Sequence, residues 1–283
     1  MNRRTVARTV SINGLGLFTG AESSAVITPA SEGEGIAFEH KSTRIPTHIA
    51  HLSISPIDAF KHLPARHTCL AINNALATTT EHLLAALAAL GITDATITLA
   101  DPGEVPIDDG SALSFVREIT NAGTTELEGA AKPITITETI SVSQGDASIT
   151  IEPAQSASYT YIYEPGSNSP LERQAATWDG SPDDFITNIA PARTFSFEHE
   201  AEQMQSLGLF TAFTPRDLLV LDERGVPIDN QLRFDNEPAR HKLLDLIGDL
   251  ALAGAPLIGK VTATKSGHAL NHEMARKLAE ISS

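Results

Sequence analysis

The sequence predicts an α+β protein made of two similar halves. Each half opens with short alternating segments typical of strands, continues with a helical segment that is apolar almost all round, and returns to a strand after a glycine. The 283 residues are enough for one large domain or two of ordinary size. We place the division in the stretch LEGAAKP, so that the first half covers residues 1–127 and the second covers residues 128–283.

The first half contains two strand regions and two helices. Residues 5–28 alternate between apolar and polar side chains, which predicts a hairpin connected through the glycines Gly14, Gly16 and Gly20. Residues 78–91 predict a buried helix, with threonines able to cap its start and a glycine at its C-cap. A strand is expected at 95–100, a turn-rich loop at 101–112 and a second helix at 113–123.

The second half repeats this plan. We predict its strands at residues 133–143, 147–153, 158–163 and 257–266. A loop-rich stretch is expected at 164–183, and a helix over 238–254 should end at Gly254.

The composition limits the partners and the compartment. The chain has 20 basic and 35 acidic residues, and its formal net charge of -15 disfavours nucleic acid and anionic membranes as partners. An anionic substrate would need a local basic pocket. Cys69 is the only cysteine, so an internal disulfide is excluded and a reducing, cytoplasmic location is expected. The N-terminus lacks the apolar core of a signal peptide, and we expect no transmembrane segment.

Three polar residues stand in line on the apolar helix of the second half. His241, Asp245 and Asp249 are four residues apart and therefore share one helix face. They are either satisfied core groups or a site, and buried carboxylates are usually paired or bound to metal. A histidine and an aspartate one turn apart can reach one cation, and catalytic zinc takes three protein ligands and leaves one place for water. Gly248 lies on the same face and would let a substrate or another chain segment come close.

His82 is the best candidate for the third ligand, because it too lies near the start of a buried apolar helix. Glu81 precedes it, and a ligand beside a carboxylate is similar to the ligand and base of H-E-x-x-H metalloproteases. The alternative is a glutamate favoured by the helix dipole beside a core histidine. His268, in KSGHALNH, is a candidate general acid that Asp249 would orient. In PARTFSF, Arg193 and Thr194 offer an oxyanion donor.

These motifs resemble the zinc-dependent UDP-3-O-acyl-N-acetylglucosamine deacetylase family of lipid A biosynthesis. The resemblance covers nearly the whole chain, through NGLGLFTG, TTEHLLAALAALGI, EVPIDDGSA, ARTFSF, LRFDNEPARHKLLDLIGDL and KSGHALN. It implies two related halves, each a small sheet with helices, packed as a sandwich with the site between them.

The resemblance also assigns roles to residues of this sequence. The metal ligands would be His82, His241 and Asp245, holding Zn²⁺ or alternatively Fe²⁺. The catalytic residues would be Glu81 as general base, His268 as general acid, Asp249 as its support, Thr194 at the oxyanion and Lys242 near the substrate's anionic part. Substrate contacts are expected at Thr194, Phe195, Lys242 and Phe213. The partner would be an acylated sugar nucleotide, and the protein a monomer.

The sequence departs from the family in three places. Phe18 replaces the histidine of G-L-H-T-G, Phe213 falls about where a glycine is usual, and the stretch 164–185 is more polar than an acyl-binding insert. His67 is either a secondary polar group near the metal or a surface histidine. Two alternatives therefore stay open: a relative that deacetylates a differently acylated or unacylated amino sugar, and a non-catalytic binding protein. Retention of Glu81 and of the ligand set argues against the second.

Overall fold

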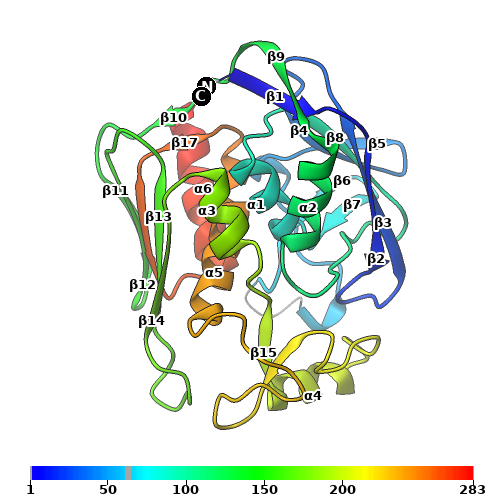
Figure 1. Cartoon of the computed structure of the whole chain (residues 1–283), viewed down its shortest axis with the longest axis vertical. Helices are drawn as coiled ribbons and strands as arrows, with labels where there is room; N and C mark the ends of the chain where they lie inside the picture. The colour runs from blue at the N-terminus through cyan, green and yellow to red at the C-terminus, as the bar shows by residue number, and fades with distance from the viewer. Residues whose placement is uncertain (1, 61–64, 283) are drawn as a thin grey trace.

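Two five-stranded sheets form the outer layers of the molecule, and helices fill the space between them (Figure 1). The structure is a computed structural model, and it describes residues 2–60 and 65–282. The first sheet has the order β2 (Val10–Leu15), β3 (Glu22–Pro29), β8 (Ala95–Leu99), β4 (Ile36–His40) and β5 (Thr43–Pro46). The second has the order β11 (Ile140–Gln144), β12 (Ala147–Glu152), β18 (Lys260–Thr264), β13 (Ser158–Tyr163) and β14 (Gln174–Trp178).

The two sheets share one topology. In each, the first three strands pair antiparallel, the third and fourth run parallel, and the fourth and fifth are antiparallel. The middle strands β8 and β18 come last in their sheets along the chain, and each follows a buried helix. This confirms the α+β class with two similar halves. The division at residues 127 and 128 stays a prediction; there β9 (Thr124–Ala130) pairs with β1 (Asn2–Val6).

Two helices meet in the middle layer, α1 (Glu81–Ala89) from the first half and α5 (Glu237–Leu250) from the second. All residues of α1 except Ala88 are buried, as its apolar composition predicts. Next to them, α6 (His268–Ser282) packs on α5, and α2 (Leu113–Ala122) packs on β2. The remaining elements are α3 (Pro182–Asp184), α4 (Glu198–Ser206), η1 (Ile49–His51), η2 (Asp58–Phe60), η3 (Phe185–Ile189), η4 (Ala251–Ala253), β6 (Cys69–Ile72), β7 (Ala75–Thr78), β10 (Ile134–Thr135), β15 (Phe195–Phe197), β16 (Leu219–Leu221) and β17 (Leu257–Ile258).

Gly248 sets the distance between α1 and α5. A Cβ atom at this position would lie 2.0 Å from the carbonyl oxygen of Glu81 and 3.0 Å from its Cα. The sequence left open whether this glycine admits a substrate or another chain segment. The structure shows that it admits another chain segment, the first turn of α1. Close packing of these backbones brings the polar residues of both helices together.

Two clusters of buried apolar side chains form the core. The larger one is continuous through both sheets and the helices between them. The smaller one, made of Leu17, Phe18, Phe60, Ile107, Met204 and Leu209, lies beside the polar ends of α1 and α5. Within the described ranges, no helix combines the length and the apolarity that a bilayer crossing needs.

Some local predictions were wrong. The predicted strand 133–143 is two separate strands, β10 and β11, and 257–266 is likewise divided into β17 and β18. The stretch 164–183, predicted as loop-rich, contains β14, which completes the second sheet. Residues 5 and 6 belong to β1, which pairs with β9 and not with the hairpin of β2 and β3.

The predicted caps of α1 differ in outcome. Thr80 occupies the N-cap position, but its side chain makes no capping hydrogen bond, because its backbone is already helical there. At the other end Gly91 has φ +70°, and the amide of Ile92 donates to the carbonyl of Leu87 at 2.9 Å. This is the left-handed glycine stop that the sequence predicts.

Candidate metal centre and active site

Three buried side chains converge where α1 meets α5. The second residue of α1 is His82, while His241 and Asp245 stand one turn apart on α5. The Nε2 atoms of both imidazoles lie 3.4 Å from Oδ1 of Asp245, and the ring centroids are 5.0 Å apart. The structure therefore brings together the three residues that the sequence nominated as ligands.

The geometry and chemistry of these donors fit a tetrahedral metal ion. Zinc bonds of about 2.0–2.1 Å to nitrogen or oxygen place tetrahedral ligands about 3.3–3.4 Å apart. Oδ1 of Asp245 is buried and accepts no hydrogen bond from the described residues, although such a group normally has a partner. His241 Nδ1 lies 3.2 Å from the carbonyl oxygen of Ala192, which leaves Nε2 free to coordinate.

The protonation states suit coordination as well. Burial lowers the pKa of His241 to about 3, so its imidazole is neutral at physiological pH. Burial opposes the charge of Asp245, but the neighbouring ammonium of Lys242 is the largest opposing influence, and the pKa of that carboxyl stays well below its usual range. The ammonium of Lys242 is 2.9 Å from Oδ2 of Asp245, whereas His82 and His241 face Oδ1.

Glu81 is the first residue of α1 and is buried beside His82. Its Oε2 accepts a hydrogen bond of 3.1 Å from the amide of Thr68. Burial raises the pKa of Glu81, although the neighbouring His268 and His82 act in the opposite direction. A carboxylate with a raised pKa at the edge of a cavity is suited to proton transfer.

A second polar cluster lies one turn further along α5, around Asp249. Its Oδ2 is 2.8 Å from Nδ1 of His268 and accepts a 2.8 Å hydrogen bond from the amide of Asn271. Its Oδ1 accepts a 2.5 Å hydrogen bond from the hydroxyl of Thr68, and His272 Nε2 is 3.4 Å away. Burial opposes a charge on His268, but Asp249 outweighs it and raises the pKa of His268 to about 9.

The sequence reasoning missed three members of this second cluster, Thr68, Asn271 and His272. A signal existed for His272, because it stands four residues after His268 in KSGHALNH, on the same face of α6. Thr68 is distant in sequence from α5 and carries no such signal.

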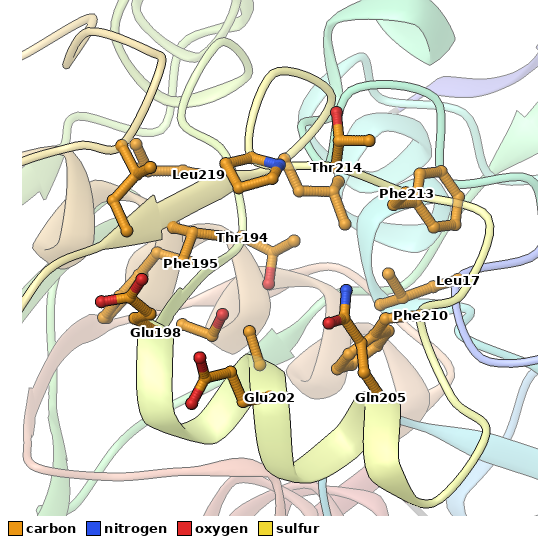
Figure 2. Close-up of a pocket in the computed structure, with 16 residues that line it drawn as sticks. Leu17, Thr194, Phe195, Glu198, Glu202, Gln205, Phe210, Phe213, Thr214 and Leu219 are labelled. Carbon is orange, nitrogen blue, oxygen red and sulfur yellow. The ribbon is translucent and has the colours of Figure 1, made fainter.

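Two adjoining cavities open at these residues. One, of about 210 Å³, is lined by Glu81, His82, His241, Lys242, Asp245 and His268 together with Thr194, Phe195 and Phe18. The other, of about 250 Å³, has a mainly apolar wall that includes Leu17, Phe210, Phe213, Leu218, Val220 and Ile228. Figure 2 shows Phe213 toward one end of this second cavity and Glu198 toward the other. Leu17, Thr194, Phe195, Ser196 and Phe210 line both cavities, so the two spaces are neighbours.

The two aromatic departures line the cavities, Phe18 the first and Phe213 the second, and His67 packs against Phe18. Phe18 is buried, and its ring packs edge-on against Phe60 and His67 at 5.0 and 4.7 Å between centroids. His67 is buried too, 2.7 Å from the hydroxyl of Ser55 and 3.2 Å from that of Thr79. It is therefore not a surface histidine, and burial lowers its pKa to about 3.

Comparison with known proteins shows the family of the chain. Residues 3–280 match the LpxC family, described as UDP-3-O-acyl N-acetylglycosamine deacetylase. The chain belongs to this family. It is 36% identical to the UDP-3-O-acyl-N-acetylglucosamine deacetylase of Myxococcus xanthus, over 98% of this chain and 86% of that protein. Enzymes of the same name from Geotalea uraniireducens and Nautilia profundicola are 36% and 35% identical, over 98% of this chain and 88% and 92% of their own lengths.

In this member of the LpxC family, Arg193 does not act as a free donor in the cavities. Its guanidinium is buried in an ion pair with Glu237, at 2.8 Å from Nε to Oε1. The next residue, Thr194, does reach both cavities, and its amide donates to the carbonyl of Gly110 at 2.7 Å. Of the two candidates for an oxyanion donor in PARTFSF, the structure thus leaves Thr194 at the site.

Proposed function

We propose that the chain is a cytoplasmic, zinc-dependent hydrolase that removes the N-acetyl group of UDP-3-O-acyl-N-acetylglucosamine in lipid A biosynthesis. Membership of the LpxC family supports the substrate class. One observation carries the chemistry: two imidazoles and a carboxylate that could hold a metal converge with a buried glutamate and a third histidine on one cavity. A non-catalytic binding protein has no need of that combination.

His82, His241 and Asp245 would hold the zinc ion. When bound, zinc supplies a Lewis acid that polarises the acetamide carbonyl and lowers the pKa of water to roughly 7. The donors fit this role because Oδ1 of Asp245 is desolvated and unpartnered among the described residues, and because the imidazole of His241 is neutral.

The protein's own residues then move two protons. Glu81 takes a proton from water as the water oxygen attacks the acetyl carbon, and its raised pKa strengthens it as a base. The bond between that carbon and the amide nitrogen breaks, and His268 gives a proton to the leaving amine. Asp249 holds His268 through Nδ1, so Nε2 is the donating atom. The products are acetate and the free amine of glucosamine.

Two further residues would stabilise negative charge on the substrate, one on the reacting oxygen and one on its anionic part. The hydroxyl of Thr194, which lines the cavity of Glu81, would donate to the oxygen that becomes negative during attack. Such a donor is typically worth about 3–4 kcal/mol of the activation barrier. Lys242 is on the same wall and would attract the anionic part of the substrate. It supplies the local basic group that a chain of net charge -15 needs for an anionic ligand.

The apolar cavity supports an acylated substrate over an unacylated one. Its wall of Leu17, Phe210, Phe213, Leu218, Val220 and Ile228 offers a hydrocarbon chain a place out of water, next to the reacting groups. We propose that the 3-O-acyl chain occupies this space and that the ring of Phe213 limits its length.

The test is single-turnover release of acetate from UDP-N-acetylglucosamine carrying 3-O-acyl chains of graded length, beside the unacylated sugar nucleotide. Metal-free protein, made with a chelator, and protein reloaded with Zn²⁺ are measured in parallel. We expect release only with metal and only from acylated substrates. Full activity without metal would overturn the mechanism, and equal activity on the unacylated nucleotide would overturn the substrate.

A further inference from the structure

Glu237 is the first residue of α5 and stands one turn before His241. It is fully buried, and its carboxylate accepts four hydrogen bonds. Arg193 gives three of them, from its amide at 3.0 Å, Nε at 2.8 Å and Nη2 at 3.1 Å, and the amide of Arg233 gives the fourth at 2.7 Å. The segments around Arg193 and Arg233 are thus both fixed to the start of α5.

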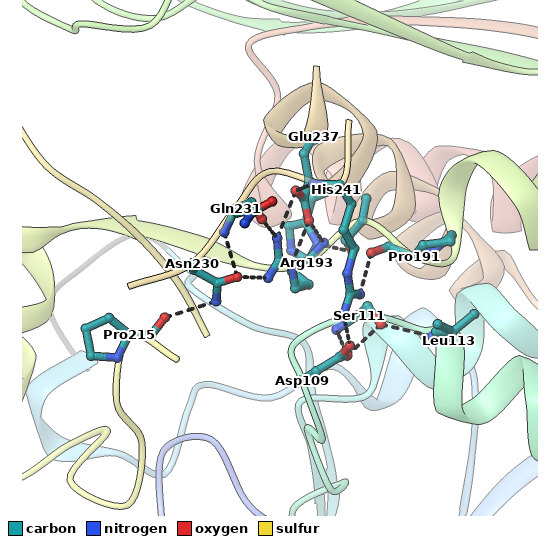
Figure 3. Close-up of polar contacts among 12 residues, drawn as sticks. Asp109, Ser111, Leu113, Pro191, Arg193, Pro215, Asn230, Gln231, Glu237 and His241 are labelled. Atoms are coloured by element: carbon teal, nitrogen blue, oxygen red, sulfur yellow. Dashed lines mark hydrogen bonds and ion pairs between the residues drawn. The ribbon is translucent and has the colours of Figure 1, made fainter. Parts of the chain in front are cut away.

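The partner of Glu237 is equally constrained. Nη1 of Arg193 donates to the side chain of Asn230 at 2.8 Å, and Nη2 donates to the carbonyl of Gln231 at 2.6 Å (Figure 3). A buried ion pair is weak evidence for stability, because desolvating both charges offsets their attraction. What such a pair can do is select one conformation of the segments it joins.

The ion pair fixes the segment around Arg193, and both neighbours of Arg193 in the sequence contribute to the candidate site. The residue before it, Ala192, presents the carbonyl that lies 3.2 Å from Nδ1 of His241. The residue after it, Thr194, lines the cavity of Glu81 and His82. Rotation or withdrawal of Arg193 would therefore disturb one proposed metal ligand and the proposed oxyanion donor together.

The same network extends to the first half. Arg233 donates from Nη2 to Oδ2 of Asp109 at 2.6 Å and from Nη1 to the carbonyl of Pro191 at 2.8 Å (Figure 3). Beyond Asp109, Gly110 has φ +84°, and a Cβ there would lie 2.8 Å from Cγ2 of Thr194. The glycine loop of the first half and the 191–194 segment of the second are therefore in direct contact.

We infer that Glu237 is a positioning residue for the proposed deacetylase reaction. Through Arg193 and Arg233 it fixes residues 191–194, and so sets both the orientation of the His241 imidazole and the place of the Thr194 hydroxyl. Glu237 lines neither of the two cavities, so it acts through other residues.

The test compares Glu237→Gln with a matched control, Asp94→Asn, in the full chain. Asp94 is a buried carboxylate paired with Arg3 at 3.0 Å, and neither residue lines either of the two cavities described above. Three quantities are measured: the melting temperature, the Kd for Zn²⁺ by chelator competition without substrate, and kcat and KM at saturating Zn²⁺. Both variants should melt earlier. Only Glu237→Gln should bind Zn²⁺ about 10–100-fold more weakly, as loss of support for a metal-bound histidine typically does.

The same variant should lose kcat with little change in KM, because Thr194 acts on the charge that develops during attack. Unchanged Zn²⁺ affinity and kcat in Glu237→Gln, or losses matched by Asp94→Asn, would overturn the inference. If Glu237→Gln fails to fold, Asp109→Asn replaces it, since the pair of Asp109 with Arg233 is partly exposed. That variant should lower kcat and leave Zn²⁺ affinity unchanged, and an unchanged kcat counts against the inference. The parent protein, measured alongside, tests the proposed function separately, since it must bind Zn²⁺ and release acetate.

Discussion

Replacing Gly248 with alanine should remove the metal site while leaving most of the fold. The added Cβ would stand 2.0 Å from the carbonyl oxygen of Glu81 and 2.7 Å from its carbonyl carbon, both backbone atoms. Backbone cannot rotate away as a side chain can, so α1 and α5 must separate by about 1 Å or more to reach ordinary contact. Overpacking of this kind typically costs about 1–3 kcal/mol of stability.

The same separation of the helices should reduce the Zn²⁺ affinity far more than it reduces the stability of the fold. His82 comes from α1, and His241 and Asp245 come from α5, so the helices move the ligands apart. Metal–ligand distances tolerate a deviation of only about 0.2 Å. We therefore expect Gly248→Ala to bind Zn²⁺ at least 100-fold more weakly, while its melting temperature falls by roughly 2–12 °C.

Chelator competition measures the Zn²⁺ affinity, and calorimetry on metal-free protein measures the melting temperature. The matched control is Gly166→Ala, since Gly166 is exposed and a Cβ there meets nothing within 4 Å. If Gly248→Ala keeps the Zn²⁺ affinity and turnover of the parent, the contact between the helices does not set the donor geometry, and the reasoning is refuted.

Three further predictions concern the chemistry. Elemental analysis after mild dialysis should find about one zinc per chain, and a chelator should abolish turnover until Zn²⁺ is restored. Glu81→Ala should keep the metal and lose turnover by roughly 10²–10⁴-fold, because a general base is removed. His241→Ala should instead lose the metal. Normal turnover per bound metal in Glu81→Ala would show that the roles are wrongly assigned. Phe213→Gly should raise kcat/KM for long acyl chains more than for short ones, by up to about fourfold for each added methylene that becomes buried. A steady gain with chain length in the parent, unaffected by the substitution, would place the ring elsewhere.

The three candidate metal ligands could be found from the sequence because their physical signature is local. An aspartate one turn after a histidine on an apolar helix, as in His241 and Asp245, needs a partner wherever it is buried. His82 shares one feature with His241, since it too lies near the start of a buried apolar helix. The halves were predictable for a similar reason, since each repeats strands, buried helix, glycine and strand. The structure brings these ligands together as that reasoning required.

What could not be predicted depends on contacts between distant segments. Thr68 bonds Asp249 across 181 positions of sequence, and nothing near Thr68 indicates it. β14 was missed because its alternation, in Gln174–Trp178, is short and follows a stretch rich in Pro, Gly and Ser; pairing with β13 makes it a strand. Thr80 looked like a cap, but the packing of α1 gives it a helical backbone and leaves its hydroxyl without a hydrogen bond among the described residues.

The origin of the donors has a consequence for the thermodynamics of the whole molecule. Because α1 belongs to one layered unit and α5 to the other, a cation bound to the proposed ligands would bridge them as a reversible cross-link. By mass action, a ligand that binds only the native state adds about 4 kcal/mol to the free energy of unfolding at a thousand times its Kd. This added free energy of unfolding arises at the contact between α1 and α5. Amide hydrogen exchange in α1 and α5 should therefore slow as the concentration of free Zn²⁺ rises, while exchange in the outer strands β5 and β14 changes least.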